Sequence, residues 1–386
     1  MLQVTGALGM GGAETWLLEL LRYWRNGGGV QSEFLLTHGN RDVFDDEARS
    51  LGAQLHYVRY GRGDLRGFAQ RLRAILREGR FDAIHDHSDC AAGWHLLLGA
   101  GTLPSVRIVH VHNSRRLQLA NYEISSSRRL TAAIGRRLVD NFATHVCGTS
   151  TAALGDYGFD AGSRRRPAVS VLHCGIAVSK FCGPREPDRQ SVRHEFGWPP
   201  QVKIVLFAGR LDQALSYTDP RNHKNSWFAV NVVRAATGRD PSVRLLMAGA
   251  GSTRAEIERH IGCWGMSDKL RLIGLRTDMP RLMRAADVLL FPSAVEPLGM
   301  VAVEAQAAGL PVLASAAVPQ EAVVVPELYA ALPLEAPMER WIDGLLKAST
   351  GARLSNDLCR GALEASPFSI AASARRLEKI YAAGRS

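Results

Sequence analysis

Two glutamates in the second half of the chain, Glu296 and Glu304, have the surroundings expected of ligand-binding carboxylates. Glu296 lies in a Pro/Gly turn after the apolar segment 287–293, which predicts a buried strand. Glu304 lies in a short alanine-rich segment that Gly309 and Pro311 must end, which predicts a helix. A carboxylate can accept hydrogen bonds from two neighbouring hydroxyl groups. The segment therefore predicts a strand, an acidic turn and a helix that carries a second carboxylate.

The first turn of this helix supplies donors to accompany those acceptors. The amides of Leu298, Gly299 and Met300 would point toward the end of the strand, where an anion can bind. Backbone donors for phosphate, flanked by carboxylates for hydroxyl groups, fit a nucleotide sugar. We therefore interpret the segment as a nucleotide-sugar site.

The elements around this segment predict two α/β domains. The 386 residues, 46% of them apolar, are enough for two cores of ordinary size. Short apolar runs alternate with amphipathic stretches, which is typical of parallel sheets covered by helices. Strands are expected at 3–6, 32–36, 54–58, 83–86, 107–111, 145–148 and 170–172, and again at 203–209, 244–248, 270–273, 288–291 and 311–314. Amphipathic helices are expected at 13–24, 65–76, 128–142 and 370–382.

The rhythm of these elements suggests the domain boundaries. We predict Rossmann-like domains at 1–175 and 176–366, the second of which carries the segment interpreted as a nucleotide-sugar site, and a closing helix at 367–386. Several prolines in the segment 175–200 indicate a linker there. Doubly wound domains bind ligands at the carboxyl ends of their strands.

The motifs follow those strand ends in an order that identifies a family. They are Gly11-Gly12-Ala13-Glu14, Phe207-Ala208-Gly209-Arg210-Leu211, the segment 286–293, and the Glu296/Glu304 pair followed by Gly309-Leu310-Pro311-Val312. Over nearly the whole chain this order resembles glycosyltransferase family 4, which has the GT-B fold of two Rossmann-like domains facing across a cleft. The resemblance implies that the domain 1–175 lies on the acceptor side, that the domain 176–366 binds the nucleotide sugar, and that the helix at 367–386 packs back toward the first domain. The sequences Gly-Gly-Ala-Glu-Thr-Trp and His-Val-His-Asn most resemble the branch that builds exopolysaccharides and capsules. Two departures are Leu298, where the family usually has phenylalanine, and the segment 211–223, which is longer than usual.

The resemblance implies an activity and a set of partners. The activity is that of a retaining, metal-independent hexosyltransferase, which moves a sugar from a nucleotide-sugar donor to a saccharide or lipid-linked saccharide in surface polysaccharide biosynthesis. No cofactor is implied, because the nucleotide sugar is a substrate. Six cysteines without paired spacing indicate reduced thiols, so we expect a cytoplasmic protein.

The resemblance also implies roles for individual residues. Arg210 and Lys224 neutralise the donor diphosphate as it leaves, and fixed cations aimed at developing charge are an effective catalytic device. Glu304 binds the ribose hydroxyls, Glu296 lies near the donor sugar, and His112 contacts the transferred sugar. Further donor-binding candidates are Gly11, Gly12, Gly251, Arg276, Leu298, Gly299 and Met300, and weaker acceptor-side candidates are His85, His87, His110 and Asn113.

Two alternatives stay open at this point. His85, His87 and Asp89 lie at a strand end with a spacing that resembles zinc hydrolase ligation, which predicts a metallohydrolase instead. A GT-B scaffold that binds a partner without catalysis is the other alternative.

The charge of the chain indicates anionic partners. The net charge is +10, and arginine supplies most of it. Segment 128–142 carries an apolar stripe with arginines beside it, which predicts either a helix packed on its own sheet or peripheral binding to the inner face of an anionic membrane. No basic motif interleaved with aromatic residues occurs, so we do not expect nucleic acid as a partner.

Overall fold

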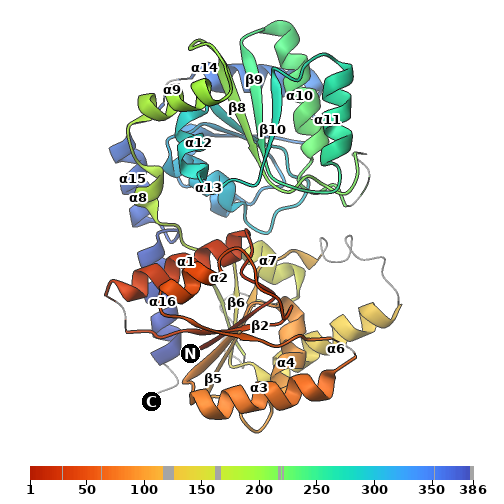
Figure 1. The fold of residues 1–386 in the computed structure, drawn as a ribbon, viewed down its shortest axis with the longest axis vertical. Helices are drawn as coiled ribbons and strands as arrows, with labels where there is room; N and C mark the ends of the chain where they lie inside the picture. Colours follow the sequence, from red (N-terminus) through yellow and green to blue (C-terminus); the bar gives the residue numbers. More distant parts are fainter. Residues whose placement is uncertain are drawn as a thin grey trace. The chain divides into compact units, whose positions relative to one another are not determined.

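The computed structural model describes residues 1–27, 29–61, 63–115, 126–160, 167–215, 219, 221–351 and 353–382. The chain forms two compact units (Figure 1). Unit 1 comprises Met1–Ile176 together with Pro367–Ser386, and unit 2 comprises Ala177–Ser366. The last helix therefore belongs to the unit that begins the chain.

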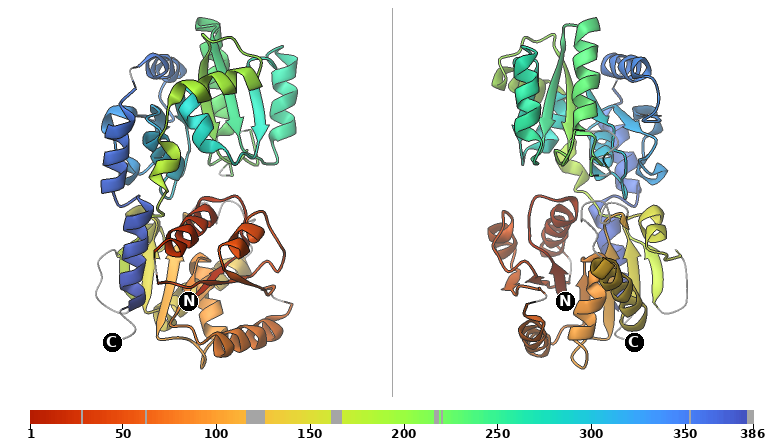
Figure 2. Two further views of the ribbon diagram at one scale, coloured as in Figure 1. Left: turned by 60° about the vertical axis from the view of Figure 1, so that its left-hand side comes forward. Right: turned by 90° about the vertical axis from the view of Figure 1, so that its right-hand side faces the viewer.

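Unit 1 is built on a seven-stranded parallel sheet with helices on both faces (Figure 2). The strands are β1 (Leu2–Thr5), β2 (Glu33–Leu36), β3 (Gln54–Tyr57), β4 (Ala83–Asp86), β5 (Val106–Val111), β6 (His145–Gly148) and β7 (Ala168–Val171), in the order β3-β2-β1-β4-β5-β6-β7. The helices are α1 (Gly12–Arg25), α2 (Asp45–Ser50), α3 (Leu65–Gly79), η1 (Asp89–Ala91), α4 (Ala92–Leu98), α6 (Ser126–Phe142), α7 (Thr151–Asp156) and α16 (Ile370–Ala382).

Unit 2 is built on a six-stranded parallel sheet. Its strands are β8 (Lys203–Ala208), β9 (Val243–Ala248), β10 (Leu270–Gly274), β11 (Val288–Phe291), β12 (Val312–Ser315) and β13 (Tyr329–Leu332), in the order β10-β9-β8-β11-β12-β13. Its helices are α8 (Val178–Phe181), α9 (Arg185–Glu195), α10 (Ser226–Arg239), α11 (Arg254–Cys263), α12 (Met279–Ala285), α13 (Met300–Ala307), η2 (Gln320–Ala322), η3 (Pro326–Leu328), α14 (Met338–Thr350) and α15 (Asn356–Ala365).

The strands form where short apolar runs can be buried on both faces. In β11 all four residues are buried, as are Val205 in β8 and Leu245 in β9, which is the pattern of parallel strands covered by helices. The order of the strands reverses between β1 and β4 in unit 1 and between β8 and β11 in unit 2. In an open α/β sheet such a switch point leaves a crevice at the carboxyl ends of the two strands. The doubly wound fold class expected for each half is confirmed.

The segment 175–200 is more ordered than a linker. It contains α8 and α9, and the side chains of Arg185, Arg189 and Arg193 on α9 all bond the carboxylate of Asp287. Prolines do not prevent this helix, because Pro184 is its N-cap and Pro187 lies in its first turn, where a missing amide hydrogen costs no helical bond.

Helix α6 packs through the second half of its apolar stripe, where Phe142 lies against the core of unit 1, and through the small residues beside it. Gly135 and Val139 face α4, and a Cβ on Gly93 of α4 would lie 2.2 Å from the Gly135 carbonyl oxygen, so the two backbones are in direct contact. Leu130 and Ile134 of the stripe are instead exposed, by 62% and 39%. Among the described residues, no helix combines the length and the apolar content that crossing a bilayer requires.

Candidate active site

The switch point of unit 2 collects the residues that the sequence singled out there. Arg210 follows β8 after Gly209, and Glu296 lies in the turn after β11, so the two come from neighbouring strands. The loop before α10 closes the group, because the amide of Ala294 donates to the carbonyl of His223 over 2.7 Å. Strand order, not distance along the chain, therefore brings these loops together.

Lys224 and Glu296 form a buried ion pair in this group. The Lys224 ammonium lies 2.5 Å from a Glu296 carboxylate oxygen and 5.5 Å from the centre of the Phe291 ring. The Glu296 side chain is only 4% exposed and that of Lys224 is 21% exposed. Removing one partner of such a pair would leave the other charge unsatisfied. The pair thus fixes the positions of both side chains.

Arg210 is held by a histidine that the sequence did not single out. Its guanidinium donates to Nε2 of His223 over 2.7 Å, and Nδ1 of the same ring lies 3.2 Å from the carbonyl of Arg221. Nε2 must therefore accept while Nδ1 donates, so the ring is neutral. Burial, together with the charges of Arg210 and Lys224, lowers the pKa of His223 to about 4. The ring orients Arg210 without adding a competing charge.

Asp212 is a second residue that sequence reasoning missed. Its carboxylate accepts hydrogen bonds from the amides of Lys224 and Ser226, over 2.9 and 3.0 Å. It thereby caps α10, whose N-cap residue Asn225 makes no side-chain cap and has a left-handed φ of 56°. The only signal in the sequence was an acid two positions after Arg210.

The turn into α13 supplies donors and one acceptor that the protein itself leaves unused. Gly299 has a φ of 96°, which favours glycine, and no described residue accepts a hydrogen bond from the amides of Leu298, Gly299 or Met300. No described residue donates to the carboxylate of Glu304, and burial raises its pKa to about 7. Leu298 as a whole residue is 2% exposed, so its side chain belongs to the core and does not face solvent.

Two other donor-binding candidates have different surroundings. A Cβ on Gly251 would lie 1.7 Å from the Leu211 carbonyl oxygen, so this glycine lets the loops after β8 and β9 touch. Arg276 is bonded to Asp278 and to Glu195, with contacts of 2.7 to 2.8 Å. The structure therefore does not bring the Arg276 side chain into the Arg210 group.

The switch point of unit 1 holds a buried group of histidines. His87 Nδ1 lies 2.9 Å from His112 Nε2, and His85 Nε2 lies 3.2 Å from His110 Nδ1. The indole of Trp16 has its ring centre within 6.4 Å of the centre of each of the four imidazoles. Helix α1 thus covers a layer of imidazoles that come from the ends of β4 and β5.

The hydrogen bonds of this group define the proton positions on all four rings. The Leu172 carbonyl can only accept, so His110 Nε2, 3.2 Å away, donates to it and His110 Nδ1 accepts from His85 Nε2. His85 Nδ1 then accepts from the hydroxyl of Tyr381 over 3.0 Å. The phenol oxygen is hydrogen-bonded by Gln3 in turn.

The same reasoning continues to the other pair of histidines. The Gln3 carbonyl oxygen accepts from His87 Nε2 over 2.8 Å, so His87 Nδ1 accepts from His112 Nε2. His112 Nδ1 is left as an acceptor and faces the sulfur of Cys174 at 3.8 Å. Burial lowers the pKa of His112 to about 3 and those of His85, His87 and His110 well below the ordinary value. All four rings are neutral, and each donates through Nε2 and can accept through Nδ1.

Asp89 does not join His85 and His87 as a third metal ligand. Its carboxylate accepts from the amide of His112 over 2.8 Å and from the side-chain amide of Asn113 over 2.9 Å. Among the described residues, the three potential ligands within reach of one another are His85, His87 and His110, and their nitrogens serve the hydrogen bonds given above. The arrangement gives no support to a His85/His87/Asp89 zinc site.

The glycine turn before α1 completes the candidates in unit 1. A Cβ on Gly11 would lie 2.2 Å from the carboxylate of Glu14, which folds back over the turn. A Cβ on Gly12 would meet no heavy atom within 4 Å. A side chain at position 11 would therefore displace the end of the flexible Glu14 side chain, whereas Gly12 faces open space.

The fold and these two switch-point sites define the class of GT-B glycosyltransferases. Two family models match, "Glycosyltransferase Family 4" over residues 10–180 and "Glycosyl transferases group 1" over residues 188–362. The protein belongs to this family of glycosyltransferases, and both the fold and the resemblance seen in the sequence are confirmed.

Individual relatives agree with this assignment. EpsF of Bacillus subtilis (strain 168), described as a glycosyltransferase, is 27% identical over 94% of this chain and 91% of its own length. The D-inositol 3-phosphate glycosyltransferase of Mycobacterium marinum is 29% identical over 82% of this chain and 68% of its own length. Anabaena HepE, solved in complex with UDP-glucose, shares the fold with a TM-score of 0.74 at 17% identity, over 99% of both chains.

Proposed function

We propose that the protein is a retaining hexosyltransferase that uses a nucleotide-sugar donor and needs no metal. The observation that carries the proposal is the β8/β11 switch point of unit 2. It presents two fixed cations, three backbone amides that no described residue accepts from, and the carboxylate of Glu304, to which no described residue donates. Cations and amides suit a diphosphate, and an unused carboxylate suits a ribose diol. HepE supports UDP-glucose as the first donor to test.

The ion pair refines the roles of Lys224 and Glu296. The two side chains bond each other, so a donor diphosphate would compete with Glu296 for the Lys224 ammonium. Glu296 would then be released toward the donor sugar, where it can accept from a hydroxyl group. Binding of the donor and release of Glu296 from Lys224 are therefore coupled.

The proton positions refine the role of His112. Its Nε2 hydrogen is committed to His87, so the ring can meet a sugar hydroxyl only by accepting at Nδ1. A thiol at 3.8 Å is a weak partner that a hydroxyl group can replace. We propose that the sugar hydroxyl donates to His112, and that His85, His87 and His110 position this ring from behind.

Arg210→Ala tests the donor site with little risk to the fold. Arg210 is exposed, so the variant should melt close to the wild-type temperature. Loss of one fixed donor aimed at developing charge costs about 100- to 1,000-fold in kcat, which a UDP-release assay with UDP-glucose and other nucleotide sugars measures. Arg259→Ala, which removes an exposed arginine elsewhere in unit 2, is the matched control. Turnover of Arg210→Ala at the wild-type rate would exclude this site.

We also propose a saccharide or lipid-linked saccharide as the acceptor, in surface polysaccharide biosynthesis at the inner face of the membrane. The sequence resemblance supports the acceptor class. The exposed Leu130 and Ile134 on α6, with Arg129 and Arg137 on the same helix, support contact with an anionic bilayer.

Liposome flotation tests the membrane contact. The wild-type protein should float with vesicles containing anionic lipid at low salt, and Leu130→Ser/Ile134→Ser should float at least several-fold less because apolar burial is lost. The control is Val43→Ser/Leu65→Ser, which makes the same kind of change at two exposed apolar residues elsewhere in unit 1. Equal flotation of both double variants would rule out α6 as the contact.

A further inference from the structure

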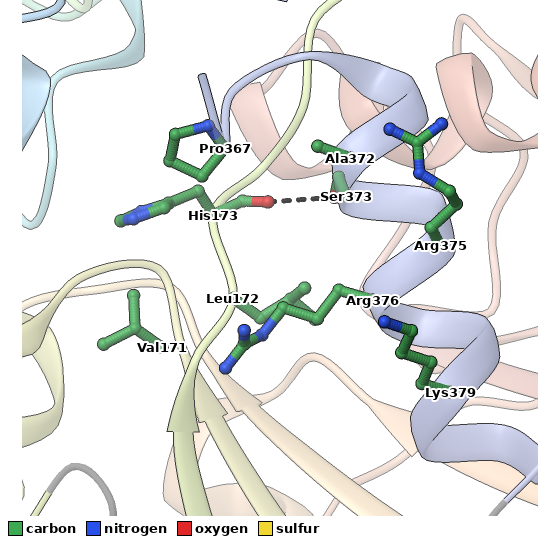
Figure 3. A pocket seen from close by; sticks show the side chains of 9 residues that line it. All are labelled: Val171, Leu172, His173, Pro367, Ala372, Ser373, Arg375, Arg376 and Lys379. Atoms are coloured by element: carbon green, nitrogen blue, oxygen red, sulfur yellow. Dashed lines mark hydrogen bonds between the residues drawn. The ribbon is translucent and has the colours of Figure 1, made fainter. Parts of the chain in front are cut away.

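A cationic pocket lies between the end of β7 and helix α16, entirely within unit 1 (Figure 3). Its volume is about 450 Å³, and none of its residues belongs to the candidate active site. It is lined by Val171, Leu172, His173, Pro367, Ala372, Ser373, Arg375, Arg376 and Lys379. The wall is thus apolar along the strand and basic along the helix.

The positive side chains share one face of α16. Ala372, Arg376 and Lys379 are spaced by four and three residues, which places them on one side of a helix. In Figure 3 the Arg376 side chain extends toward the end of β7 and the Lys379 ammonium points to the same side, whereas Arg375 points away from them. The small side chain of Ala372 leaves the room that the pocket occupies.

These cations have no protein counter-charge in the part of the chain that the structure describes. No carboxylate of the described residues pairs with Arg375, Arg376 or Lys379, although most arginines of unit 2 are paired. Like charges three residues apart destabilise a helix slightly. A favourable interaction with the helix C-terminus accounts for Lys379 alone, since Arg376 lies mid-helix. The charges are therefore available to a ligand.

The strand adds a backbone donor to the same wall. β7 is an edge strand, and the amides of Ala168 and Leu172 donate to the carbonyls of Thr144 and Gly148 near β6. Alternation along the strand then turns the Val171 amide toward the free edge, where no described residue accepts its hydrogen. A sheet edge of this kind favours an anion.

Hydrogen bonds hold the pocket wall in place. The Leu172 carbonyl accepts from His110, the His173 carbonyl accepts from the Ser373 hydroxyl over 2.9 Å, and that hydroxyl accepts from the Trp16 indole over 3.0 Å. Nδ1 of His173 lies 2.7 Å from the carbonyl of Thr149. Because both sides are fixed without a ligand, binding would require little reorganisation.

We propose that this pocket binds a phosphate ester whose phosphate is carried on an apolar group. The phosphate would lie between Arg376, Lys379 and the Val171 amide, and the apolar part would lie on Val171, Leu172 and Pro367. The pocket would bind a second ligand, different from the donor, and the proposal does not depend on the proposed donor site. A lipid phosphate and a soluble phosphorylated saccharide share the phosphate, but only the lipid phosphate also brings an apolar group to this wall.

Calorimetric titration with two soluble probes tests the proposal. The probes are inorganic phosphate and monomeric dihexanoyl phosphatidic acid, and at least one should bind the wild-type protein. At least tenfold tighter binding of the phosphatidic acid is expected, because only this probe covers the apolar wall, whereas equal affinities would identify a site for phosphate alone and overturn the apolar part of the proposal. In Arg376→Gln/Lys379→Gln, affinity for the binding probe should fall at least tenfold, because two charge-assisted hydrogen bonds are lost.

The controls separate the pocket from general charge and from the donor site. Arg66→Gln/Arg77→Gln removes the same charge from exposed positions of α3 and should bind like the wild type. The stabilisation of Arg376→Gln/Lys379→Gln by UDP-glucose in a thermal-shift assay should equal that of the wild type. Absence of binding by both probes, or equal losses in the two double variants, would overturn the proposal.

Discussion

Replacing Glu304 by glutamine should abolish use of the donor and at the same time make the protein more stable above pH 7. Glutamine keeps the shape but loses one of the two acceptor oxygens that a ribose diol needs, so we expect kcat/KM to fall at least 100-fold. Donor binding by the wild type should strengthen as the pH rises through 7, because burial raises the pKa of Glu304 to about 7 and the ionised form is the better acceptor.

The stability change follows from the same raised pKa. An unfolded chain releases this proton near the ordinary pKa of 4.5, whereas the folded chain keeps it until about pH 7. The free energy of unfolding therefore falls as the pH rises between these values and stays lower above them. Glutamine has no such proton, so Glu304→Gln should gain about 1–3 kcal/mol over the wild type at pH 8 and nearly nothing at pH 4.5.

Urea unfolding at the two pH values measures this gain, and UDP release measures the activity. Glu327→Gln, at an exposed position of unit 2, should change neither quantity. A variant that is less stable at pH 8 and also inactive would show that Glu304 is a structural residue. A variant that keeps wild-type turnover would show that Glu304 does not bind the donor.

Acid should destabilise unit 1 steeply below pH 6.5. The four clustered histidines are neutral when folded because burial lowers their pKa values, but each takes up a proton near pH 6.5 once unfolded. The unfolded state then binds more protons than the folded state, so stability is lost as the pH falls. Four such groups lower the free energy of unfolding by about 4–5 kcal/mol between pH 7.5 and 5.5.

Urea unfolding followed by tryptophan fluorescence at several pH values gives this slope. His87→Gln should reduce the slope by about a quarter, since glutamine can replace the two hydrogen bonds without titrating. His194→Gln changes an exposed histidine of unit 2 and should leave the slope as it is. Equal slopes in the wild type and in His87→Gln would show that this ring is already protonated in the folded protein.

The sequence predicted those parts of the protein that depend on nearby residues. Apolar runs located twelve of the described strands to within two or three residues, and Gly309 marked the end of α13. Strand β13 was missed, because none of its four residues is buried, two are exposed, and its sequence lacks a strong apolar run. Helix α9 was missed because two prolines near its start suggested a break.

Contacts between distant residues could not be predicted in the same way. The Lys224–Glu296 pair joins two loops 72 residues apart, and the hydrogen bond between His85 and Tyr381 spans 296 residues. Each histidine by itself suggested a ligand, and only the fold shows that its nitrogens face other side chains. The position of Arg210, by contrast, could be predicted, because a strand and a glycine lie directly before it in the sequence.

The composition of unit 1 has a consequence for how the protein is made. Gln3 and Tyr381 are linked in one chain of hydrogen bonds, and Trp16 bonds Ser373, so the first strand and the last helix complete each other. A ribosome releases the whole of unit 2, residues 177–366, before that helix emerges. Domains fold as units during synthesis. The half of the protein that is translated first is therefore completed only after unit 2 has been made, and until helix α16 emerges its imidazole layer lacks the phenol that orients it.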